Sequence, residues 1–67
     1  MKIQLIYTDG SARVVVVDPA STILESLKSI LSSNQCLLYD GSIVKAHNTY
    51  ITRQVRNNDM FDVMLIK

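Results

Sequence analysis

The chain has 67 residues, of which 48% are hydrophobic and 19% charged, and its net charge is +1. This length fits one domain, spanning residues 1–67, and folding buries only about 60% of the unfolded surface at this size, which leaves little room for a deep substrate pocket. The small net charge argues against nucleic acid or acidic membranes as partners, because neither would be attracted electrostatically. We expect an intracellular protein of the cytoplasm or nucleus. A single cysteine cannot form the disulfides that usually stabilise a small secreted domain, and no signal segment precedes the first strand pattern.

Residues 1–17 predict an antiparallel hairpin. The first five side chains alternate between apolar and polar, which is typical of a strand with one buried face. Asp9-Gly10 supplies the turn, because glycine accepts a positive φ. Residues 14–17 are all valine, and their branched side chains suit a pleated strand better than a helix.

A helix is expected after Pro19. Thr22 and Glu25 have the spacing of a capping box, in which each side chain satisfies a free amide at the start of a helix. Asn34 is expected to end the helix in the left-handed conformation. The apolar residues at helical spacing form the expected buried face, which comprises Ile23, Leu24, Leu27, Ile30 and Leu31.

Two short strands are expected next, at residues 35–39 and 43–44, joined by the turn residues Asp40-Gly41. Residues 45–57 show weak periodicity, so we expect an irregular crossing loop with a short helical turn. Tyr50 and Val55 are its expected core anchors.

The last strand shows strict alternation. Phe61, Val63 and Leu65 are expected to point inward, and the side chains between them outward. One helix must then cover the apolar face of one sheet, because a core this small can be closed in no other way. The predicted fold class is therefore α+β, with a mixed sheet of four to five strands covered by one helix.

No constellation of residues indicates an enzyme. Cys36 is a candidate nucleophile, but it would need a nearby base, and the only histidine, His47, falls in the predicted loop. One cysteine and one histidine do not provide a metal site, which needs three or four ligands at regular spacing. Two isolated turn glycines do not form a phosphate-binding loop. We therefore expect no catalysis, no cofactor and no metal.

The sequence resembles the ubiquitin-like family over nearly its whole length. The matching segments are Met1-Lys2-Ile3, Asp9-Gly10, Val17-Asp18-Pro19, Ser21-Thr22-Ile23, Lys28-Ser29-Ile30, residues 35–41 (Gln-Cys-Leu-Leu-Tyr-Asp-Gly), Thr49 and Val63-Met64-Leu65. Residues 58–64 are more similar to SUMO-like domains. The resemblance implies a β-grasp fold in which the first and last strands lie side by side and parallel, and it implies a function in binding other proteins.

The sequence departs from ubiquitin in two places. The connection at residues 32–35 is about six residues shorter on our alignment. The chain also ends at Leu65-Ile66-Lys67 without the two glycines that the family's modifiers join to lysines. A covalent modifier or sulfur carrier without its glycine tail is therefore an alternative to a module that acts by docking alone.

Sheet alternation predicts a face turned away from the helix that holds apolar residues. Such exposed apolar patches usually mark interaction sites. The resemblance adds that this face is where ubiquitin binds most partners, that Leu38 and Met64 keep the apolar character of the family's positions, and that Asp62 replaces a histidine. The expected contact residues on this face are Ile6, Leu38, Asp62, Met64 and Ile66.

A second candidate site is the edge of the strand at residues 14–17. SUMO-like domains bind an extended peptide at the corresponding edge by adding a strand, and Val14, Val16 and Lys28 would be the contacts here. The same edge could instead pair weakly with a second copy of the chain, which would make this a self-assembling structural domain.

Overall fold

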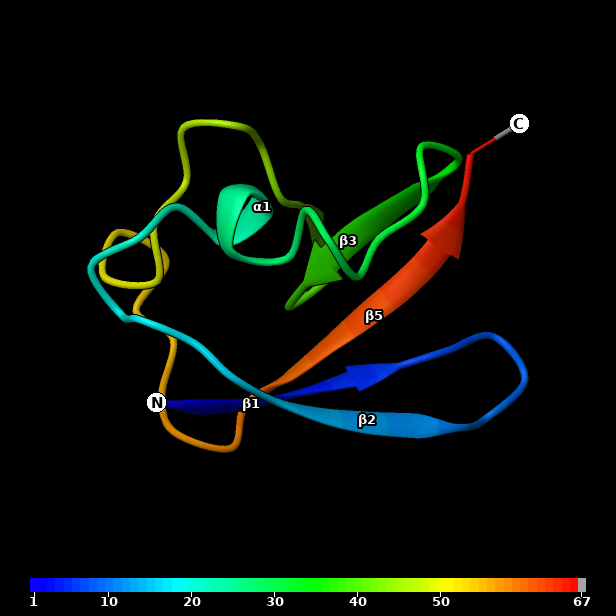
Figure 1. Ribbon diagram of the computed structural model, residues 1–67, viewed down its shortest axis with the longest axis horizontal. Coiled ribbons are helices and arrows are strands. Elements are labelled where there is room, and N and C mark those ends of the chain that lie inside the picture. The colour runs from blue at the N-terminus through cyan, green and yellow to red at the C-terminus, as the bar shows by residue number, and fades with distance from the viewer. Residues whose placement is uncertain (67) are drawn as a thin grey trace.

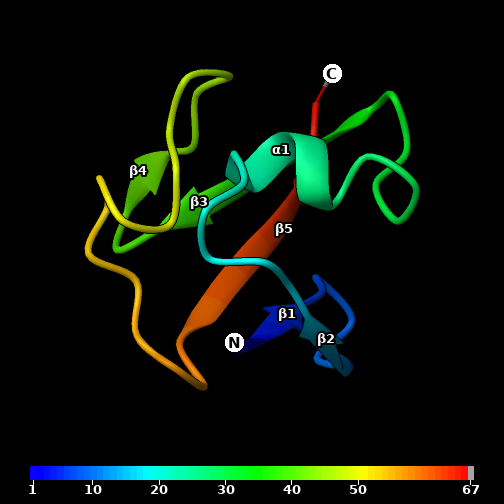
Figure 2. The ribbon, with the colours of Figure 1, turned by 60° about the vertical axis from the view of Figure 1, so that its left-hand side comes forward.

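The computed structural model describes residues 1–66, which form one five-stranded sheet and one short helix. The order along the chain is β1 (Lys2–Ile6), β2 (Ala12–Val16), α1 (Ile23–Ser26), β3 (Gln35–Tyr39), β4 (Ser42–Ile43) and β5 (Met60–Leu65). The strand order in the sheet is β2-β1-β5-β3-β4 (Figure 1 and Figure 2). β1 pairs antiparallel with β2 and parallel with β5, as predicted, and β3 pairs antiparallel with both β5 and β4. This α+β architecture is compatible with a β-grasp.

Both Asp-Gly pairs form the turns that the sequence predicts. Gly10 has a φ of 87°, and its N–H donates to the carbonyl of Tyr7 at 3.0 Å, which closes the loop between β1 and β2. Between β3 and β4, Asp40 and Gly41 have φ values of 53° and 81°. Two consecutive left-handed residues give a turn whose twist matches that of the flanking strands.

The helix is shorter than the apolar spacing predicts. α1 ends at Ser26, and the chain continues to Ile30 as turns. The hydroxyl of Ser26 donates to the carbonyl of Ile23 at 2.8 Å, and such local bonds compete with the helical backbone pattern. The N–H of Leu27 bonds the carbonyl of Leu24 at 3.3 Å, three residues back, where a helix would bond four residues back.

The N-cap lies at Thr22, as predicted, but the predicted capping hydrogen bond and the predicted C-terminal cap are wrong. Thr22 precedes α1, but its side chain makes no capping hydrogen bond. The N–H of Ile23 instead donates to the carbonyl of Asn48 at 3.0 Å. Asn34 is not left-handed, and the C-cap is Leu27 with a φ of −107°. The start of α1 is therefore tied to the loop before β5.

One face of the sheet packs on α1 and on the loop at residues 44–57 (Figure 2). Tyr50 is 1% exposed, which confirms it as a core anchor, and its ring meets Phe61 edge-on at a centroid distance of 6.2 Å. Its hydroxyl lies 2.6 Å from Oγ of Ser26 and donates to it, because the Ser26 proton is already directed at Ile23. The buried core comprises Ile3, Leu5, Val17, Ile23, Leu27, Leu37, Val44, Tyr50, Phe61 and Val63.

Leu65 continues the alternation of Phe61 and Val63 along β5, but its side chain is 61% exposed and not buried. Its register partner is Gln35 at the start of β3, and the single turn of α1 does not extend over this end of the sheet.

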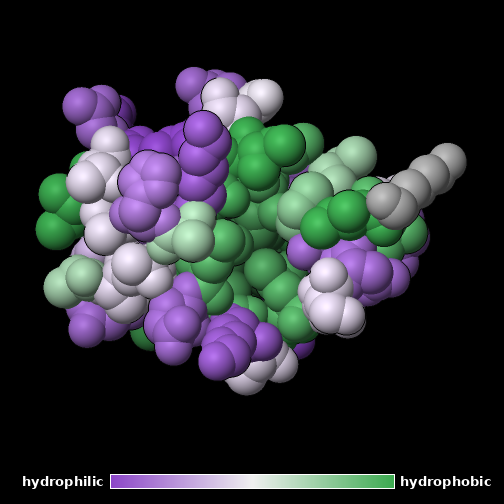
Figure 3. Space-filling view, turned by 90° about the horizontal axis from the view of Figure 1, so that it is seen from above, coloured by the Kyte–Doolittle hydropathy of each residue, from purple (hydrophilic) through white to green (hydrophobic). Residues whose placement is uncertain are grey.

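Seen from above, apolar surface forms a hollow in the middle of the molecule (Figure 3). No helix within residues 1–66 is long and apolar enough to cross a membrane.

Candidate functional site

Alternate residues of all five strands point to the side of the sheet that α1 does not cover. We call these residues the outer face. Their partners in alternation, such as Leu5, Leu37 and Phe61, are fully buried on the other side. The register gives the outer face as Lys2, Gln4, Ile6, Ala12, Val14, Val16, Cys36, Leu38, Ile43, Met60, Asp62 and Met64.

The composition of the outer face is unusual for an uncovered sheet surface. All of its residues except Lys2, Gln4 and Asp62 are apolar, whereas a solvated face normally carries polar side chains. Its exposed large apolar side chains range from 40% exposure at Met64 to 74% at Val16, whereas Ile6, Cys36 and Leu38 are half-buried. Exposing so many apolar side chains on one face to water is unfavourable in free energy. An apolar patch of this kind usually marks a place where another molecule binds.

Asp62 lies at the centre of this surface. Its register partners are Ile6 on β1 and Leu38 on β3. Leu38 in turn pairs with Ile43 on β4, and Ile6 pairs with Ala12 on β2. One row across the whole sheet therefore consists of apolar side chains with a single exposed carboxylate in the middle. Its cross-strand neighbours offer that carboxylate neither a cation nor a hydrogen-bond donor.

The structure brings most of the predicted contact residues together. Ile6, Leu38, Asp62 and Met64 lie on adjacent strands of the outer face, and Met64 pairs with Cys36. Ile66 follows β5, is 53% exposed, and its N–H donates to the carbonyl of Asn34 at 2.7 Å.

Val14, Val16 and Lys28 do not share one face. Val14 and Val16 lie on the outer face at the β2 edge, separated from Asp62 by β1. Lys28 is exposed on the turns that follow α1, on the opposite side of the sheet.

Sequence reasoning missed two of the exposed large apolar residues on the outer face. Met60 is 62% exposed and extends the alternation of Asp62 and Met64 by one step, so starting the last strand one residue earlier would have found it. Ile43 is 59% exposed and lies opposite Leu38 because of the tight turn at Asp40-Gly41. The turn type fixes that pairing.

A second, polar region lies at the end of β3, where a shallow depression of about 470 Å³ is lined by Tyr39, Asp40, Arg53, Gln54, Arg56, Asp59 and Met60. Nη2 of Arg53 donates to the carbonyl of Tyr39 at 2.9 Å, and its guanidinium carbon lies 5.5 Å from the centre of the Tyr39 ring. The hydroxyl of Tyr39 donates to Oδ2 of Asp59 at 2.6 Å. These groups bind one another and tie the loop to the sheet.

The same hydrogen bond shifts two titrations. The phenol of Tyr39, together with the N–H of Arg56, holds the pKa of Asp59 below its ordinary 3.8. The carboxylate of Asp59 raises the pKa of Tyr39 above its ordinary 10.0. Both shifts favour the protonation states in which Tyr39 donates to Asp59, so the hydrogen bond is kept over the pH range between the two pKa values.

Cys36 and His47 are not brought together. Cys36 is half-buried on the outer face of β3. His47 is exposed in the loop on the other side of the sheet. The residue after it, Asn48, accepts the N–H of Ile23 at the start of α1. Within residues 1–66, no three histidine, cysteine, aspartate or glutamate side chains gather where they could hold a metal ion.

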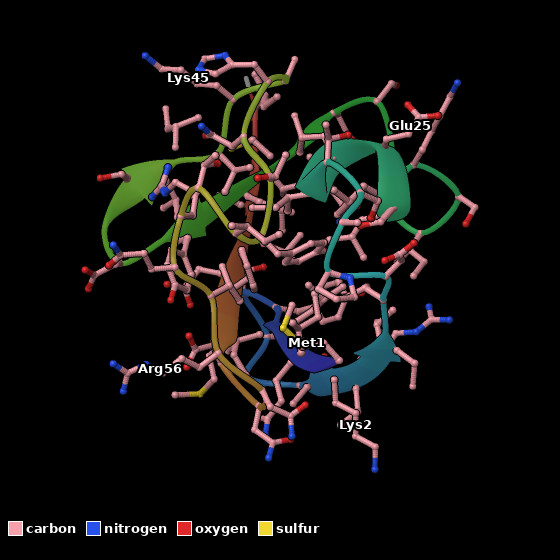
Figure 4. The ribbon with its side chains drawn as sticks, turned by 90° about the vertical axis from the view of Figure 1, so that its left-hand side faces the viewer. Met1, Lys2, Glu25, Lys45 and Arg56 are labelled. Atoms are coloured by element: carbon pink, nitrogen blue, oxygen red, sulfur yellow. The ribbon has the colours of Figure 1, made fainter. Side chains whose placement is uncertain are left out.

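Charge is spread around the periphery of the molecule. Lys2, Glu25, Lys45 and Arg56 point away from its centre in different directions, whereas Met1 points inward (Figure 4). The outer face is therefore the main chemical feature of the described surface. The sequence matches no protein-family model and no curated protein. The argument for a function therefore rests on that surface.

Proposed function

We propose that this protein is a non-catalytic interaction module that docks other proteins on the outer face of its sheet. The observation that carries the proposal is the row from Ile6 through Asp62 and Leu38 to Ile43, in which half-buried and exposed apolar side chains flank one exposed carboxylate. Apolar side chains that gather on one uncovered face favour a macromolecular partner over a small ligand, which would need a concave pocket.

The chemistry of the row indicates what the partner carries. Apolar side chains on the partner would cover Leu38, Met64 and Ile43. A lysine or arginine at the centre of that apolar contact would pair with Asp62, since burying this carboxylate without a cation would weaken binding. The carboxylate thus selects among apolar partners, because a partner with an acid at that position would be repelled.

Kinship with ubiquitin-like proteins is part of the proposal. It is supported by the strand order β2-β1-β5-β3-β4, the parallel pairing of β1 with β5, and the segments at residues 35–41 and 63–65 that resemble that family. The proposal also includes an intracellular setting, in which the free thiol of Cys36 would stay reduced.

The test compares partner capture by matched variants in extracts of the natural cell. Leu38→Asp and Met64→Asp place a second carboxylate on the outer face, and Ile51→Asp places one on the loop, where Ile51 is 70% exposed. We expect the two outer-face variants to lower partner affinity at least ~30-fold, the effect typical of a central contact residue, and Ile51→Asp to leave it unchanged.

Asp62 provides a test of the partner's charge. Asp62→Asn should weaken capture and Asp62→Lys should weaken it further, because the second change opposes two cations. Two-dimensional NMR spectra that match the natural chain would show that each variant is folded. Capture that survives both Leu38→Asp and Met64→Asp would rule out the outer face as the docking site.

A further inference from the structure

The edge of β2 leaves a regular set of backbone groups without a strand partner. β2 is the terminal strand of the sheet and forms its lower border in Figure 1. Met1 and Val17 exchange two hydrogen bonds, of 2.8 and 3.1 Å, so they form a hydrogen-bonded pair of the antiparallel ladder. Such pairs recur at every second residue. Arg13 and Val15 therefore turn their N–H and C=O groups toward β1.

It follows that Ala12, Val14 and Val16 turn their N–H and C=O groups to the open edge. This set is symmetric about Val14. A second β2 strand, placed antiparallel with Val14 opposite Val14 of the other copy, would pair Ala12 with Val16 at both ends. Every open donor and acceptor of β2 would then find a partner in an identical chain.

Side-chain chemistry selects this register. Shifting the pairing so that the two-fold axis passes through Arg13 would set two guanidinium groups directly opposite each other, which is unfavourable. With the axis at Val14, Arg13 lies opposite Val15 of the other copy, and its aliphatic stem can cover that valine. An axis at Val15 would leave the open groups of Ala12 without a partner within the strand.

The exposed side chains of the edge favour a second copy as the occupant. Val14 is 60% and Val16 74% exposed, and pairing would bury both against valine and alanine of the other chain. The edge carries no proline, and its one charged side chain, Arg13, lies on the inner face, so it has few of the features that usually prevent edge pairing. A net charge of +1 per chain opposes association only weakly.

We propose that the protein forms a two-fold symmetric dimer by antiparallel pairing of β2 with β2 of a second copy, with Val14 on the axis. The dimer joins two sheets into one and makes their outer faces continuous. Edge pairing alone buries less than roughly 1,200 Å², the range of weak and transient interfaces. The dimer is therefore populated only at high concentration. This inference does not rest on the proposed docking function, which uses the centre of the outer face.

The experiment is a concentration series from micromolar to millimolar, followed by sedimentation and by NMR of the backbone amides. We expect the mass to rise toward twice that of the monomer. The amide signals of Ala12, Val14 and Val16 should shift with concentration, since their protons become bonded. Those of Arg13 and Val15 should move much less, because their protons are already bonded to β1.

Two matched variants test the contact. Val14→Lys and Met60→Lys each add one positive charge to the outer face at positions 60% and 62% exposed, but only Val14 lies at the axis. We expect Val14→Lys to weaken association about 10-fold, because two cations then face each other, and Met60→Lys to leave it nearly unchanged. Mixing equal amounts of Val14→Lys and Val14→Glu chains should restore dimers, in which opposite charges meet.

Three results would overturn the proposal. The first is a monomer at every concentration. The second is a dimer that Met60→Lys weakens as much as Val14→Lys does, which would assign the contact to the sheet face. The third is a shift of the Ala12, Val14 and Val16 amides only when an extended foreign peptide is added, which would assign the edge to a different partner.

Discussion

At the scale of single residues, the contact between Tyr39 and Asp59 joins the sheet to the segment that leads into β5. Tyr39 stacks on Phe61 at a centroid distance of 4.8 Å and donates its proton to Asp59. Asp59 also accepts the N–H of Arg56 at 2.8 Å. The sequence alone could not reveal this contact, because Tyr39 and Asp59 lie 20 residues apart and no local pattern links a strand tyrosine to a loop aspartate.

We expect Tyr39→Phe to lower the free energy of unfolding at neutral pH by about 1 kcal/mol, since phenylalanine keeps the stacking but removes the hydrogen-bond donor. The pH dependence should also change. The folded pKa of Asp59 lies below 3.8, so its contribution is complete above that value and is lost as the pH falls through the folded pKa. The folded pKa of Tyr39 lies above 10.0, so its contribution is complete below that value and is lost as the pH rises through the folded pKa.

Urea unfolding across acidic and alkaline pH, with an NMR titration of the Asp59 carboxyl, measures both effects. In Tyr39→Phe the pKa of Asp59 should rise toward its ordinary value. Tyr7→Phe is the control, since it removes the hydroxyl of another half-buried tyrosine that packs on the core. An Asp59 titration that is identical in Tyr39→Phe and the natural chain would contradict this account.

At the scale of elements, the strands were predictable and the helix was not. Alternation and the Asp-Gly turns depend on neighbours in the sequence, and these signals located all five strands within one or two residues. The length of α1 depends on bonds that compete with the helix, such as the one from Ser26 to Ile23, and on the distant carbonyl of Asn48. Helical spacing of leucines was therefore not sufficient to predict a long helix.

The predicted helical turn in the loop at residues 45–57 is present and ends in a recognisable motif. The N–H of Val55 donates to the carbonyl of Tyr50 at 2.9 Å, and the N–H of Gln54 to that of Ile51 at 3.0 Å. These are the two bonds of a Schellman motif, whose left-handed position usually holds glycine. Here Gln54 occupies it, with a φ of 56°.

This position allows a stabilising substitution. A left-handed conformation costs a residue with a side chain about 1–2 kcal/mol, and the greater freedom of unfolded glycine offsets about 0.4–1 kcal/mol of the gain. We therefore expect Gln54→Gly to raise the free energy of unfolding by up to about 1 kcal/mol. Thermal or urea unfolding measures it, and Ile51→Gly, at an exposed position without a positive φ, should be destabilising. A destabilised Gln54→Gly chain would show that the motif is not strained.

At the scale of the whole molecule, the candidate site was predictable as far as alternation reaches. Ile6, Leu38, Asp62 and Met64 follow from the period of two along each strand. Their meeting in one row required the parallel pairing of β1 with β5, which the resemblance implied and no local signal gave. The extent of the outer face beyond them depended on where β5 begins and on how β4 turns back, and both are set by tertiary structure.

The central position of β5 leads to a last prediction. Phe61 is fully buried on the middle strand, where it contacts Tyr39 and Tyr50. The next residue toward the N-terminus, Met60, is 62% exposed on the outer face. Truncating a buried phenylalanine costs about 3–5 kcal/mol, whereas a domain of this length has a total stability of roughly 3–10 kcal/mol.

We therefore expect Phe61→Ala to unfold a large part of the population at 25 °C and Met60→Ala to change the free energy of unfolding by less than about 0.5 kcal/mol. Circular dichroism during urea unfolding distinguishes the two. Phe61→Leu should fall between them, because leucine refills much of the cavity but loses both aromatic contacts. Similar unfolding midpoints for Phe61→Ala and Met60→Ala would mean that β5 is not the strand on which the core closes, and the assignment of its two faces would fail with it.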